Sequence, residues 1–402
     1  MIVVGLLLAL AGGAAAAFGL YLIALALASF RYSQSIEGLS PHSRLAVLIP
    51  AHDEELLVGR TIRSLRAQSY PRELFRIAVI ADNCTDRTAE VAAAAGADVV
   101  MVRDAPDARG KGRALQWAMD QLLSAEQPPD AIVSVDADTI TDADLLLALV
   151  ERLEAGAQAV QSDYRAIGDG SESAALREAG FLLFNRVRPA GCNVLGRSAW
   201  LVGNGWLLSA QLLRRRPWAA FTSTEDREYS LDLQSDGVRI AFAGAAAVHA
   251  PTAPSHQAAQ TQQLRWEGGW ASLLRARLPR LLRDAWHKRS ADPLLVAFEL
   301  AVPPLGLLAA GALGGLLISA SLALVGLWSG WLVAPWVIAF ASVPLYVVIG
   351  FIAGDAPRSA YRALLHAPLF VLAKPLSLRR TLGFRGDTWV RTERTSQSDS
   401  AA

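Results

Sequence analysis

The sequence predicts an α/β domain with a Rossmann-like, mixed and mostly parallel sheet, together with transmembrane α-helices. Short apolar runs alternate with amphipathic stretches over residues 45–162, the pattern of a parallel sheet whose strands are joined by helices. Polar residues follow several of these runs directly, as they do at the edge of a sheet that binds a ligand. Long uncharged stretches lie toward both ends of the chain, and 52% of its residues are hydrophobic.

Composition narrows the classes of function. The 402 residues carry 38 Lys and Arg against 37 Asp and Glu, a formal net charge of +1, so no basic surplus indicates a nucleic-acid partner. The two cysteines, Cys84 and Cys192, are too few for a disulfide framework and lack metal-ligand spacing, which suits a reducing compartment. We interpret both as small, partly buried residues.

Residues 1–31 predict a transmembrane helix. Residues 2–30 carry no charge, and as a helix they would measure about 43 Å, more than the roughly 30 Å of a bilayer's hydrocarbon core. A cleaved signal peptide is the alternative, but no basic residue precedes the apolar stretch, which is also longer than a typical signal core. Because Arg31 and Arg44 follow it, the positive-inside rule places the N-terminus outside and the next domain in the cytoplasm.

Residues 44–270 are expected to form the α/β domain. A capping box of Thr141 and Asp144 is expected to begin a helix that runs through residue 153. Another helix is expected to follow Thr224 and to end at Gly237, and residues 198–208 are expected to be extended with a glycine turn. Strands are expected at residues 45–49, 75–81, 98–102, from 131 to the acids at 136 and 138, and 159–162. Further helices are expected at residues 54–68, 85–95, 112–124 and 172–187.

Two acids end the strand that begins at residue 131. In extended backbone, residues i and i+2 point to the same side, so Asp136 and Asp138 would face one pocket and share a divalent cation with a diphosphate. The motif alone is weak evidence, because Asp-x-Asp is common in turns and Asp138 could simply help to begin the next helix. The assignment therefore depends on the rest of the chain.

Other polar residues gather at strand ends. His52, Asp53 and Glu54 follow the first strand, and Asp82 and Asn83 follow the second. One carboxylate in such a place is usually a turn or helix cap, whereas the same placement on three strands is what a nucleotide pocket needs.

A basic loop opens the helix at residues 112–124. Lys111 would meet phosphate charge beside a helix N-terminus, although a solvated basic loop is an equally good interpretation of this stretch alone. No glycine-rich loop follows the first strand, which excludes a dinucleotide fingerprint and a Walker A loop.

Two further motifs lie later in the domain. Acids such as Glu225 and Asp226 in a first helical turn are commonly partners of the helix dipole. Gln262, Arg265 and Trp266 would share one face of a helix, which without context is a surface patch with an aromatic anchor.

The C-terminal part predicts membrane-associated segments. Residues 271–291 form a basic amphipathic segment that would lie along an anionic cytoplasmic surface, and Pro279 is expected to break it. Residues 292–353 are expected to hold two spans, at 294–326 with a kink near Pro303 and Pro304, and at 331–352. Residues 354–402 would hold an in-plane or re-entrant segment at 361–376 and a cytoplasmic tail. A further crossing would put these arginines outside: Arg379, Arg380, Arg385, Arg391 and Arg394.

The ordered set of motifs resembles membrane-integrated family 2 glycosyltransferases with a GT-A catalytic domain, such as cellulose synthase-like, hyaluronan synthase-like and ceramide glucosyltransferase-like enzymes. The motifs are short, but their order over residues 45–270 is specific. The sequence departs from the family at His52-Asp53 and at Asn83-Cys84. These departures leave open which nucleobase the donor carries and how the donor is bound. The matching pieces are Ile49-Pro50-Ala51-His52-Asp53-Glu54-Glu55, Ala81-Asp82-Asn83-Cys84-Thr85-Asp86, Lys111-Gly112, Asp136-Ala137-Asp138, Thr224-Glu225-Asp226, and the QxxRW box at Gln262, Arg265 and Trp266.

The resemblance implies a role for each of these residues. Asp226 would be the catalytic base, with Glu225 beside it orienting it, and Asp138 with Asp136 would hold Mg²⁺ or Mn²⁺. Residues similar to His52, Glu54, Asp82, Lys111 and Asp136 bind the nucleotide sugar, and residues similar to Gln262, Arg265, Trp266 and Asn204 serve the acceptor and the leaving diphosphate.

The function expected from this resemblance is an inverting, metal-dependent transfer of a sugar, from a UDP-sugar by preference, to a lipid or polysaccharide at the cytoplasmic face of a bacterial-type inner membrane. A processive polysaccharide synthase is an alternative. A sugar nucleotidyltransferase would need the glycine-rich loop that is absent. A nucleotide-binding membrane scaffold or export subunit is the non-enzymatic alternative, and an accessory subunit is a further conceivable partner.

Overall fold

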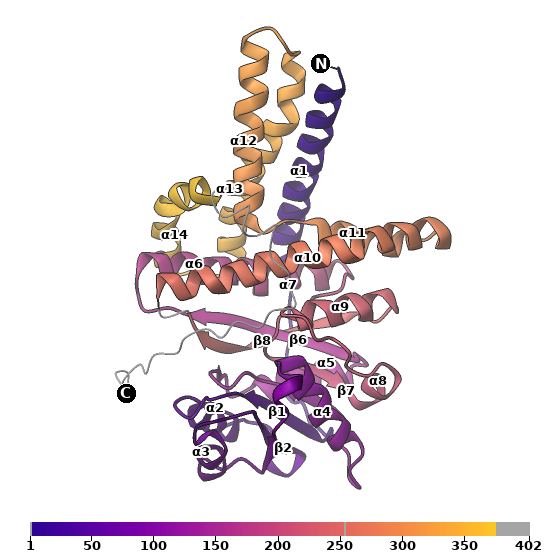
Figure 1. The fold of residues 1–402 in the computed structure, drawn as a ribbon, viewed down its shortest axis with the longest axis vertical. Helices are drawn as coiled ribbons and strands as arrows, with labels where there is room; N and C mark the ends of the chain where they lie inside the picture. Colours follow the sequence, from indigo (N-terminus) through magenta and orange to yellow (C-terminus); the bar gives the residue numbers. More distant parts are fainter. Residues whose placement is uncertain (1, 253–254, 375–402) are drawn as a thin grey trace. The chain divides into compact units, whose positions relative to one another are not determined.

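The computed structural model describes residues 2–252 and 255–374, which fall into two compact units (Figure 1). Within those residues, one unit holds 33–169 and 197–269, and we call it the sheet unit. The other, which we call the helical unit, holds 2–32, 170–196 and 270–374. Residues 170–196, which we expected inside the α/β domain, therefore group with the membrane-type helices.

The sheet unit is built on an eight-stranded mixed sheet in the order β3-β2-β1-β4-β7-β6-β8-β5. Neighbours from β3 to β4 are parallel, as are β6 and β8, whereas β7 is antiparallel to both β4 and β6, and β5 is antiparallel to β8. This confirms a mixed, mostly parallel sheet. The strands are β1 Leu45–Ala51, β2 Phe75–Asp82, β3 Val99–Arg103, β4 Ala131–Ser134, β5 Ile140–Thr141, β6 Ala159–Ile167, β7 Trp206–Ser209 and β8 Ile240–Pro251.

Helices of the sheet unit lie close to where the apolar periodicity predicted them. Strands β1 and β4 are buried almost along their whole length, because both lie in the middle of the sheet and carry aliphatic side chains on both faces. The sequence analysis missed β5, β8 and α8. The helices are α2 Val58–Arg66, α3 Thr88–Ala94, α4 Lys111–Leu123, α5 Leu145–Glu154, α8 Ala210–Arg215 and α9 Glu225–Ser235.

Strand β4 is shorter than predicted. It ends at Ser134, and a turn follows in which the Thr139 amide donates to the Asp136 carbonyl at 3.2 Å. Asp136 and Asp138 therefore lie in a turn rather than in extended backbone, and the expectation that strand alternation orients them is wrong. The turn itself keeps both residues at the carboxyl end of β4.

The predicted capping box is also wrong. Thr141 belongs to β5, and its hydroxyl accepts from Gln68 Nε2 at 3.0 Å. Helix α5 follows Asp144, whose side chain makes no capping hydrogen bond. Thr224 precedes α9 in the same way, without a side-chain cap. Thr141 therefore pairs with β8 as part of β5 and does not cap the helix.

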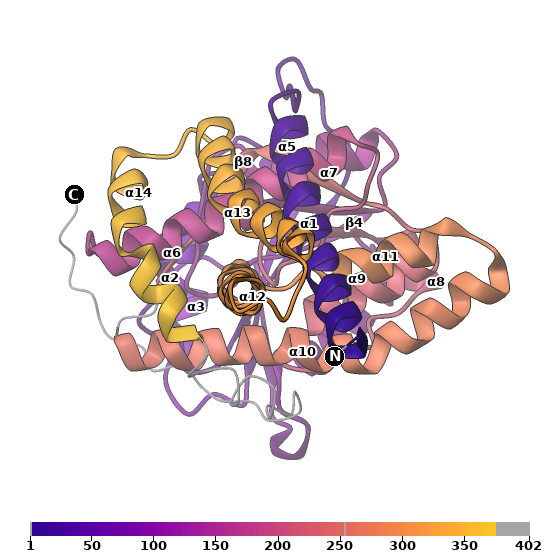
Figure 2. The ribbon, with the colours of Figure 1, turned by 90° about the horizontal axis from the view of Figure 1, so that it is seen from above.

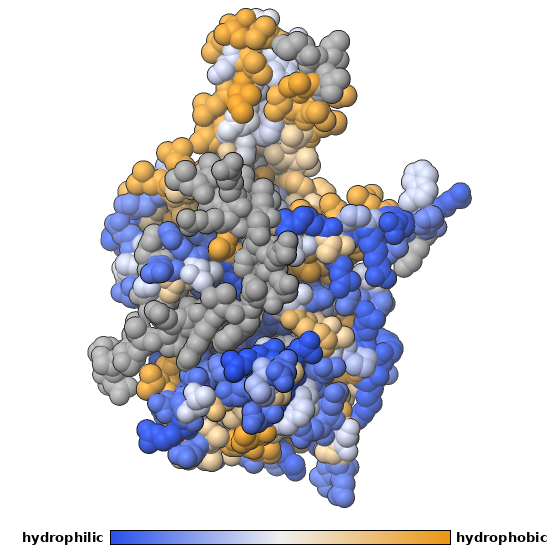
Figure 3. All heavy atoms as spheres, in the orientation of Figure 1, coloured by the Kyte–Doolittle hydropathy of each residue, from blue (hydrophilic) through white to orange (hydrophobic). Residues whose placement is uncertain are grey.

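Three helices of the helical unit are long and apolar enough to cross a membrane. Their apolar spans cover Val4–Ser29, Leu305–Leu324 and Gly330–Ala353. Helices α1, α12 and α13 run side by side, and α6, α7 and α11 lie across their base (Figures 1 and 2). Hydrophobic side chains cover the visible face of that column (Figure 3). The helices are α1 Ile2–Ser29, α6 Glu172–Leu182, α7 Arg188–Val194, α10 His256–Lys288, α11 Ala291–Ala301, α12 Leu305–Leu324, α13 Ala334–Ala353 and α14 Arg358–Ala363.

The prolines of this unit confirm one of the predicted positions of a break and contradict the other. Pro279 lies inside the continuous helix α10, so the expected break there is wrong. Pro303 and Pro304 separate α11 from α12 completely, so the predicted kinked span is two helices and the apolar span begins at Leu305. Pro189 does not end the preceding helix, because it falls in the first turn of α7, where a missing amide is tolerated.

The segment after α13 is helical as far as the structure describes it. Backbone of helical type continues from α14 through residue 374. Whether residues 361–376 lie in the membrane plane stays a prediction. Residues 375–402, with the five arginines used to orient the tail, lie outside the described residues.

Polar bonds and close backbone contacts hold the helical unit together. Tyr21 in α1 donates to Glu299 Oε1 in α11 at 2.9 Å, and Glu299 is buried. Trp270 Nε1 donates to the Leu300 carbonyl at 2.8 Å. Gly191 in α7 approaches α1 so closely that a Cβ there would lie 2.1 Å from the Leu25 carbonyl oxygen. These contacts fix α1 against α7 and α11.

Gly191→Ala should destabilise the helical unit, because the added methyl group would overlap the backbone of Leu25 in α1. Unlike a side chain, this backbone cannot rotate away. We expect a loss of about 1–3 kcal/mol, seen as a lower unfolding temperature in detergent. Gly180→Ala is the matched control: it also lies in a helix, a Cβ there meets nothing within 4 Å, and the change should raise stability slightly. Equal effects of the two changes would contradict the packing described here.

Candidate functional site

Lys111 joins two acidic groups that are far apart in the sequence. Its Nζ lies 2.5 Å from Asp136 Oδ1, in the turn after β4, and 4.0 Å from Glu225 Oε1, in the first turn of α9. The same ammonium donates to the Gly203 carbonyl at 2.5 Å. A Cβ on Gly203 would lie 3.5 Å from Asp226 Oδ2, so this carboxylate belongs to the same cluster. Four segments of the sheet unit therefore meet around one cation.

The local sequence explains why Lys111 reaches this position. Gly110 adopts a φ of +117°, which lets the chain turn sharply into α4. Gly112 packs on the backbone before α9, because a Cβ there would lie 2.2 Å from the Ala220 carbonyl oxygen. The Gly-Lys-Gly sequence thus brings the start of α4 against the chain that leads to Glu225.

The turn after β4 is held from within. The Asp136 amide donates to Asn204 Oδ1 at 3.0 Å, and Asn204 Nδ2 donates to Thr139 Oγ1 at 2.8 Å. Asp138, between them, is only 8% exposed. Thr61 Oγ1 donates to the Ala137 carbonyl at 2.7 Å. The turn is therefore rigidly supported on both sides.

The Asn204 side chain is fully buried and bonds to the Asp136–Thr139 turn. The expected role of Asn204 at the acceptor or the diphosphate stays a prediction. A second buried side chain, Gln161 of β6, grips the loop from the other side. Sequence reasoning missed Gln161, because a single glutamine within a strand carries no pattern that distinguishes it.

Burial and the neighbouring charges shift three pKa values. Burial alone would lower the pKa of Lys111, but the Asp136 and Glu225 carboxylates outweigh it and raise this pKa, so Lys111 stays charged. Burial raises the pKa of Glu225 to about 7, Lys111 opposes that shift, and Asp226 adds to it. Burial also raises the pKa of Asp226, against the positive charges of Arg227 and Lys111.

A second group of predicted residues lies at the ends of β1 and β2. His52 Nδ1 lies 2.8 Å from the Asp82 carbonyl oxygen. Asp82 Oδ1 accepts from Arg103 Nη1 at 2.5 Å, and both side chains are buried. Arg103 was missed, although it ends β3 directly opposite Asp82 in the parallel register. Glu54 bonds through its amide to Thr88 Oγ1 at 2.8 Å, so these strand ends are tied together.

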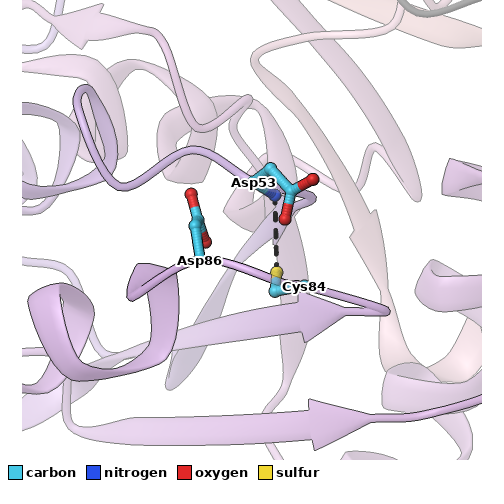
Figure 4. A group of neighbouring side chains, drawn as sticks. All are labelled: Asp53, Cys84 and Asp86. Atoms are coloured by element: carbon cyan, nitrogen blue, oxygen red, sulfur yellow. Dashed lines mark hydrogen bonds between the residues drawn. The ribbon is translucent and has the colours of Figure 1, made fainter.

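Asp53, Cys84 and Asp86 bring three potential metal ligands within 4.8 Å of one another (Figure 4). Their bonding indicates a structural role instead. Asp86 accepts from the amides of Glu55 and Thr88, and Asp53 Oδ1 accepts from the Thr85 amide at 2.7 Å. Burial raises the pKa of the Cys84 thiol, which disfavours the thiolate that a metal needs. The group joins the loop after β1 to the loop after β2.

The QxxRW box lies in the first part of α10. A Cβ on Gly269 would lie 2.3 Å from Thr224 Cγ2, so this stretch packs beside the start of α9. Arg265 is one helical turn before Gly269, and within the described residues its buried Nε has no hydrogen-bond partner. Trp266 is 40% exposed. The convergence of Gln262, Arg265 and Trp266 with the Lys111 cluster stays a prediction.

Comparison with known proteins identifies the family. The family described as "Glycosyltransferase like family 2" matches residues 41–269, which is more than half of the chain. The chain belongs to this family. Its sheet unit is accordingly a GT-A glycosyltransferase domain, as the order of the sequence motifs predicted.

Individual relatives are more distant. The chain is 28% identical over 257 residues to the beta-monoglucosyldiacylglycerol synthase of Nostoc sp., covering 60% of this chain and 52% of that enzyme. It is 37% identical over 99 residues to the 4,4'-diaponeurosporenoate glycosyltransferase of Staphylococcus aureus, covering 24% of each. The chain thus spans about half the length of the first relative and a quarter of the second.

A solved structure shows the same fold. The mannosyltransferase PcManGT from Pyrobaculum calidifontis, in complex with GDP-Man and Mn²⁺, superposes with a TM-score of 0.51 over 86% of this chain and 97% of that one, at 16% identity. This likeness concerns the fold alone.

The raised pKa of Glu225 predicts a pH-dependent stability. Because the folded protein holds this proton more tightly than the unfolded chain, the contribution is complete below the ordinary pKa near 4.5 and is lost as the pH rises through about 7. Glu225→Gln should therefore be more stable than the native protein at pH 8, by on the order of 1–3 kcal/mol, and should gain much less at pH 5. Thermal unfolding of both proteins in chelator, without nucleotide, measures this. The same difference at both pH values would contradict the assignment.

Proposed function

We propose that the protein is an inverting, metal-dependent glycosyltransferase that moves a sugar from a nucleotide sugar, a UDP-sugar by preference, to a lipid or polysaccharide acceptor at the cytoplasmic face of the membrane. The observation that carries the proposal is the position of Lys111 between Asp136 and Glu225. It joins the Asp-x-Asp turn, which suits a diphosphate and its metal, to the helix start that carries the proposed base.

The donor set fits a hard divalent cation. Asp136 and Asp138 offer carboxylate oxygens, the ligands that Mg²⁺ and Mn²⁺ prefer, and Asp138 is held in a buried turn. Two carboxylates do not complete a coordination shell, so diphosphate oxygens would supply further ligands. A bound cation would stabilise negative charge on the departing diphosphate. Lys111 provides a second positive charge for the same phosphates.

Asp226 is the proposed base. Its raised pKa strengthens it as a proton acceptor near neutral pH. It would take the proton from the acceptor hydroxyl as that oxygen bonds to the anomeric carbon, while the bond from this carbon to the diphosphate oxygen breaks. Glu225, next to it and beside Lys111, would keep the base oriented. One displacement by one base inverts the configuration at the anomeric carbon.

A lipid acceptor is favoured over a polymer. The three apolar helices among the described residues support an acceptor in a membrane. One relative is named a monoglucosyldiacylglycerol synthase and another a diaponeurosporenoate glycosyltransferase, and both names specify a lipid-like molecule. Three such helices are also few for a channel that would export a polymer. Purified protein incubated with UDP- and GDP-sugars and a membrane lipid extract should release the nucleoside diphosphate and form a product with a single sugar added. A ladder of longer products would indicate the processive alternative, and nucleotide binding without turnover the non-enzymatic one.

Asp226→Asn and Asp138→Ala should each lower acceptor-dependent turnover about a hundredfold or more, because they remove the base and a metal ligand. Release of the nucleoside diphosphate measures the rate. Asp236→Asn is the matched control: Asp236 follows the same helix α9 but pairs with Arg216, and the change should leave turnover nearly intact. Unchanged turnover in Asp226→Asn would refute the role of the base.

We further propose that the second part of α10 lies on an anionic membrane surface. Arg280, Arg283 and Arg289 are exposed there, and Trp286 is 82% exposed. Arginine beside exposed tryptophan suits the lipid headgroup region. Within the helical unit, this part of α10 runs crosswise to α1 and α12 (Figure 1), which is the direction an interfacial helix takes.

In nanodiscs containing phosphatidylglycerol, lipids brominated near the headgroup should quench a fluorescence component that Trp286→Phe abolishes. The triple change of Arg280, Arg283 and Arg289 to Gln should weaken this quenching, and so should 1 M salt, because salt screens exposed charges. The same change at the exposed Arg60, Arg63 and Arg76 of the sheet unit is the control and should leave it intact. Equal quenching in pure phosphatidylcholine would show that anionic lipid is not required.

A further inference from the structure

We propose that Gln161 is a positioning residue of the donor site. Through Asn204, it fixes the position of the Asp136–Thr139 turn. Through the same loop, it fixes the Gly203 carbonyl, which accepts a hydrogen bond from Lys111. Gln161 is 1% exposed on β6 and bonds to neither Asp136 nor Lys111 itself, so its effect must be transmitted. The inference rests on the function proposed above.

The amide of Gln161 grips both ends of one short loop. Its Oε1 accepts from the Val202 amide at 3.0 Å, and its Nε2 donates to the Asn204 carbonyl at 2.8 Å. The Nε2 group also donates to the Ser162 carbonyl at 3.0 Å. The two bonds from Nε2 are buried and the bond from Val202 is partly buried, so removing the amide leaves the Asn204 carbonyl and the Val202 amide without these partners.

The loop then grips the metal-binding turn. The Asn204 side chain bridges the turn: it accepts a hydrogen bond from the Asp136 amide and donates one to Thr139. Asn204 and Thr139 are both fully buried. Gln161 of β6 thus holds the backbone of Asn204, and the side chain of Asn204 holds the Asp-x-Asp turn. Such outer-shell bonds fix the direction of the ligand carboxylates.

The backbone of the loop has little freedom to compensate. Gly205 adopts a φ of +68°, and a Cβ there would lie 2.3 Å from Ser162 Oγ. Its amide donates to the Ser134 carbonyl and its carbonyl accepts from the Ser162 amide, both at 2.9 Å. One end of the loop is thus fixed between β4 and β6. At the other end, the Leu201 amide donates to Ser230 Oγ at 2.9 Å, while the Val202 amide and the Gly203 carbonyl bond to Gln161 and Lys111.

Loss of the Gln161 amide should therefore disturb two donor-site groups at once. The Gly203 carbonyl that accepts from Lys111 lies between the two loop atoms that Gln161 holds. If this part of the loop moves, the Gly203 carbonyl no longer holds Lys111 in place. The Asn204 side chain then also no longer holds the turn that carries Asp136. Binding of a divalent cation with a diphosphate should then weaken, whereas acceptor binding should not.

The test is Gln161→Met, which keeps the length of the side chain and removes its amide. Calorimetric titration with Mn²⁺ in the presence of UDP, or of GDP if the native protein prefers it, measures the cation site without turnover. We expect about a 10- to 100-fold weaker half-saturation, a lower kcat and an unchanged KM for the acceptor. Thr139→Val removes only the hydrogen bond from Asn204, should weaken Mn²⁺ binding less, and should not add fully to Gln161→Met.

Gln68→Met is the matched control. Gln68 is also a buried glutamine that bridges backbone groups, donating to the Asp142 carbonyl at 2.7 Å and accepting from the Leu146 amide at 3.0 Å. Its loss should lower the unfolding temperature as much as Gln161→Met does, with Mn²⁺ binding intact.

The remaining outcomes distinguish a failure of the proposed function from a failure of the inference about Gln161. Native protein that binds neither UDP nor GDP with Mn²⁺ overturns the proposed function and this inference together. Native-like Mn²⁺ binding in Gln161→Met or in Thr139→Val overturns the inference and leaves the function standing. Equal weakening by Gln68→Met shows a general loss of stability and also overturns it. If Gln161→Met does not fold, Thr139→Val alone decides.

Discussion

The arrangement of the candidate site depends on one buried ammonium group, that of Lys111, close to several carboxylates. Without Lys111, Asp136, Glu225 and Asp226 would bring negative charge together in a poorly solvated place, which folding would oppose. With it, the segments after β4 and before α9 can approach one another. The same charge that makes the cluster compatible with folding is available to a diphosphate. Structural and functional demands therefore fall on one side chain.

Hydrogen bonds around this cation supply the geometry that charge alone would not. Coulombic attraction is nearly independent of direction, so an ammonium and a carboxylate would tolerate many arrangements. The amides of Gln161 and Asn204 are directional, and they connect strand β6 to the turn that carries Asp136 and Asp138. The connection is possible because β7 lies between β4 and β6 and pairs antiparallel with both. The loop that precedes β7 therefore reaches both of these strands.

The sequence predicted the parallel strands well, because aliphatic runs such as β1 and β4 alternate with amphipathic helices and end in polar residues. It failed where pairing partners decide the structure. Strand β8 is rich in alanine and has no strong strand signal, yet it pairs with β6 along its length. Thr141 resembled a helix cap, but β8 claims it as the partner of Val248.

The candidate site shows the same division. Lys111, Asp136, Glu225 and Asp226 were predicted from motif order, and the structure brings them together. Arg103 and Gln161 were not, since their importance comes from which buried group each one faces. The sequence indicated that the glycine-flanked loop around Asn204 can approach another group closely, but not that its side chain bonds to the Asp136–Thr139 turn. Burial and bonding partners are properties of the folded chain only.

The π-helical turn at Leu183–Val187 has a consequence for the register of the helical unit. A π-turn accommodates one more residue than a turn of α-helix does, and in a regular helix that residue would rotate everything downstream by about 100°. The carbonyl of Leu183 accepts from Tyr346 in α13, and Gly191 in α7 then meets α1. Deleting one residue here would restore a regular helix and leave Gly191 facing α1, because the wider turn takes up the rotation that the extra residue adds. The contact between α7 and α1 therefore tolerates a one-residue difference in length that is confined to this turn.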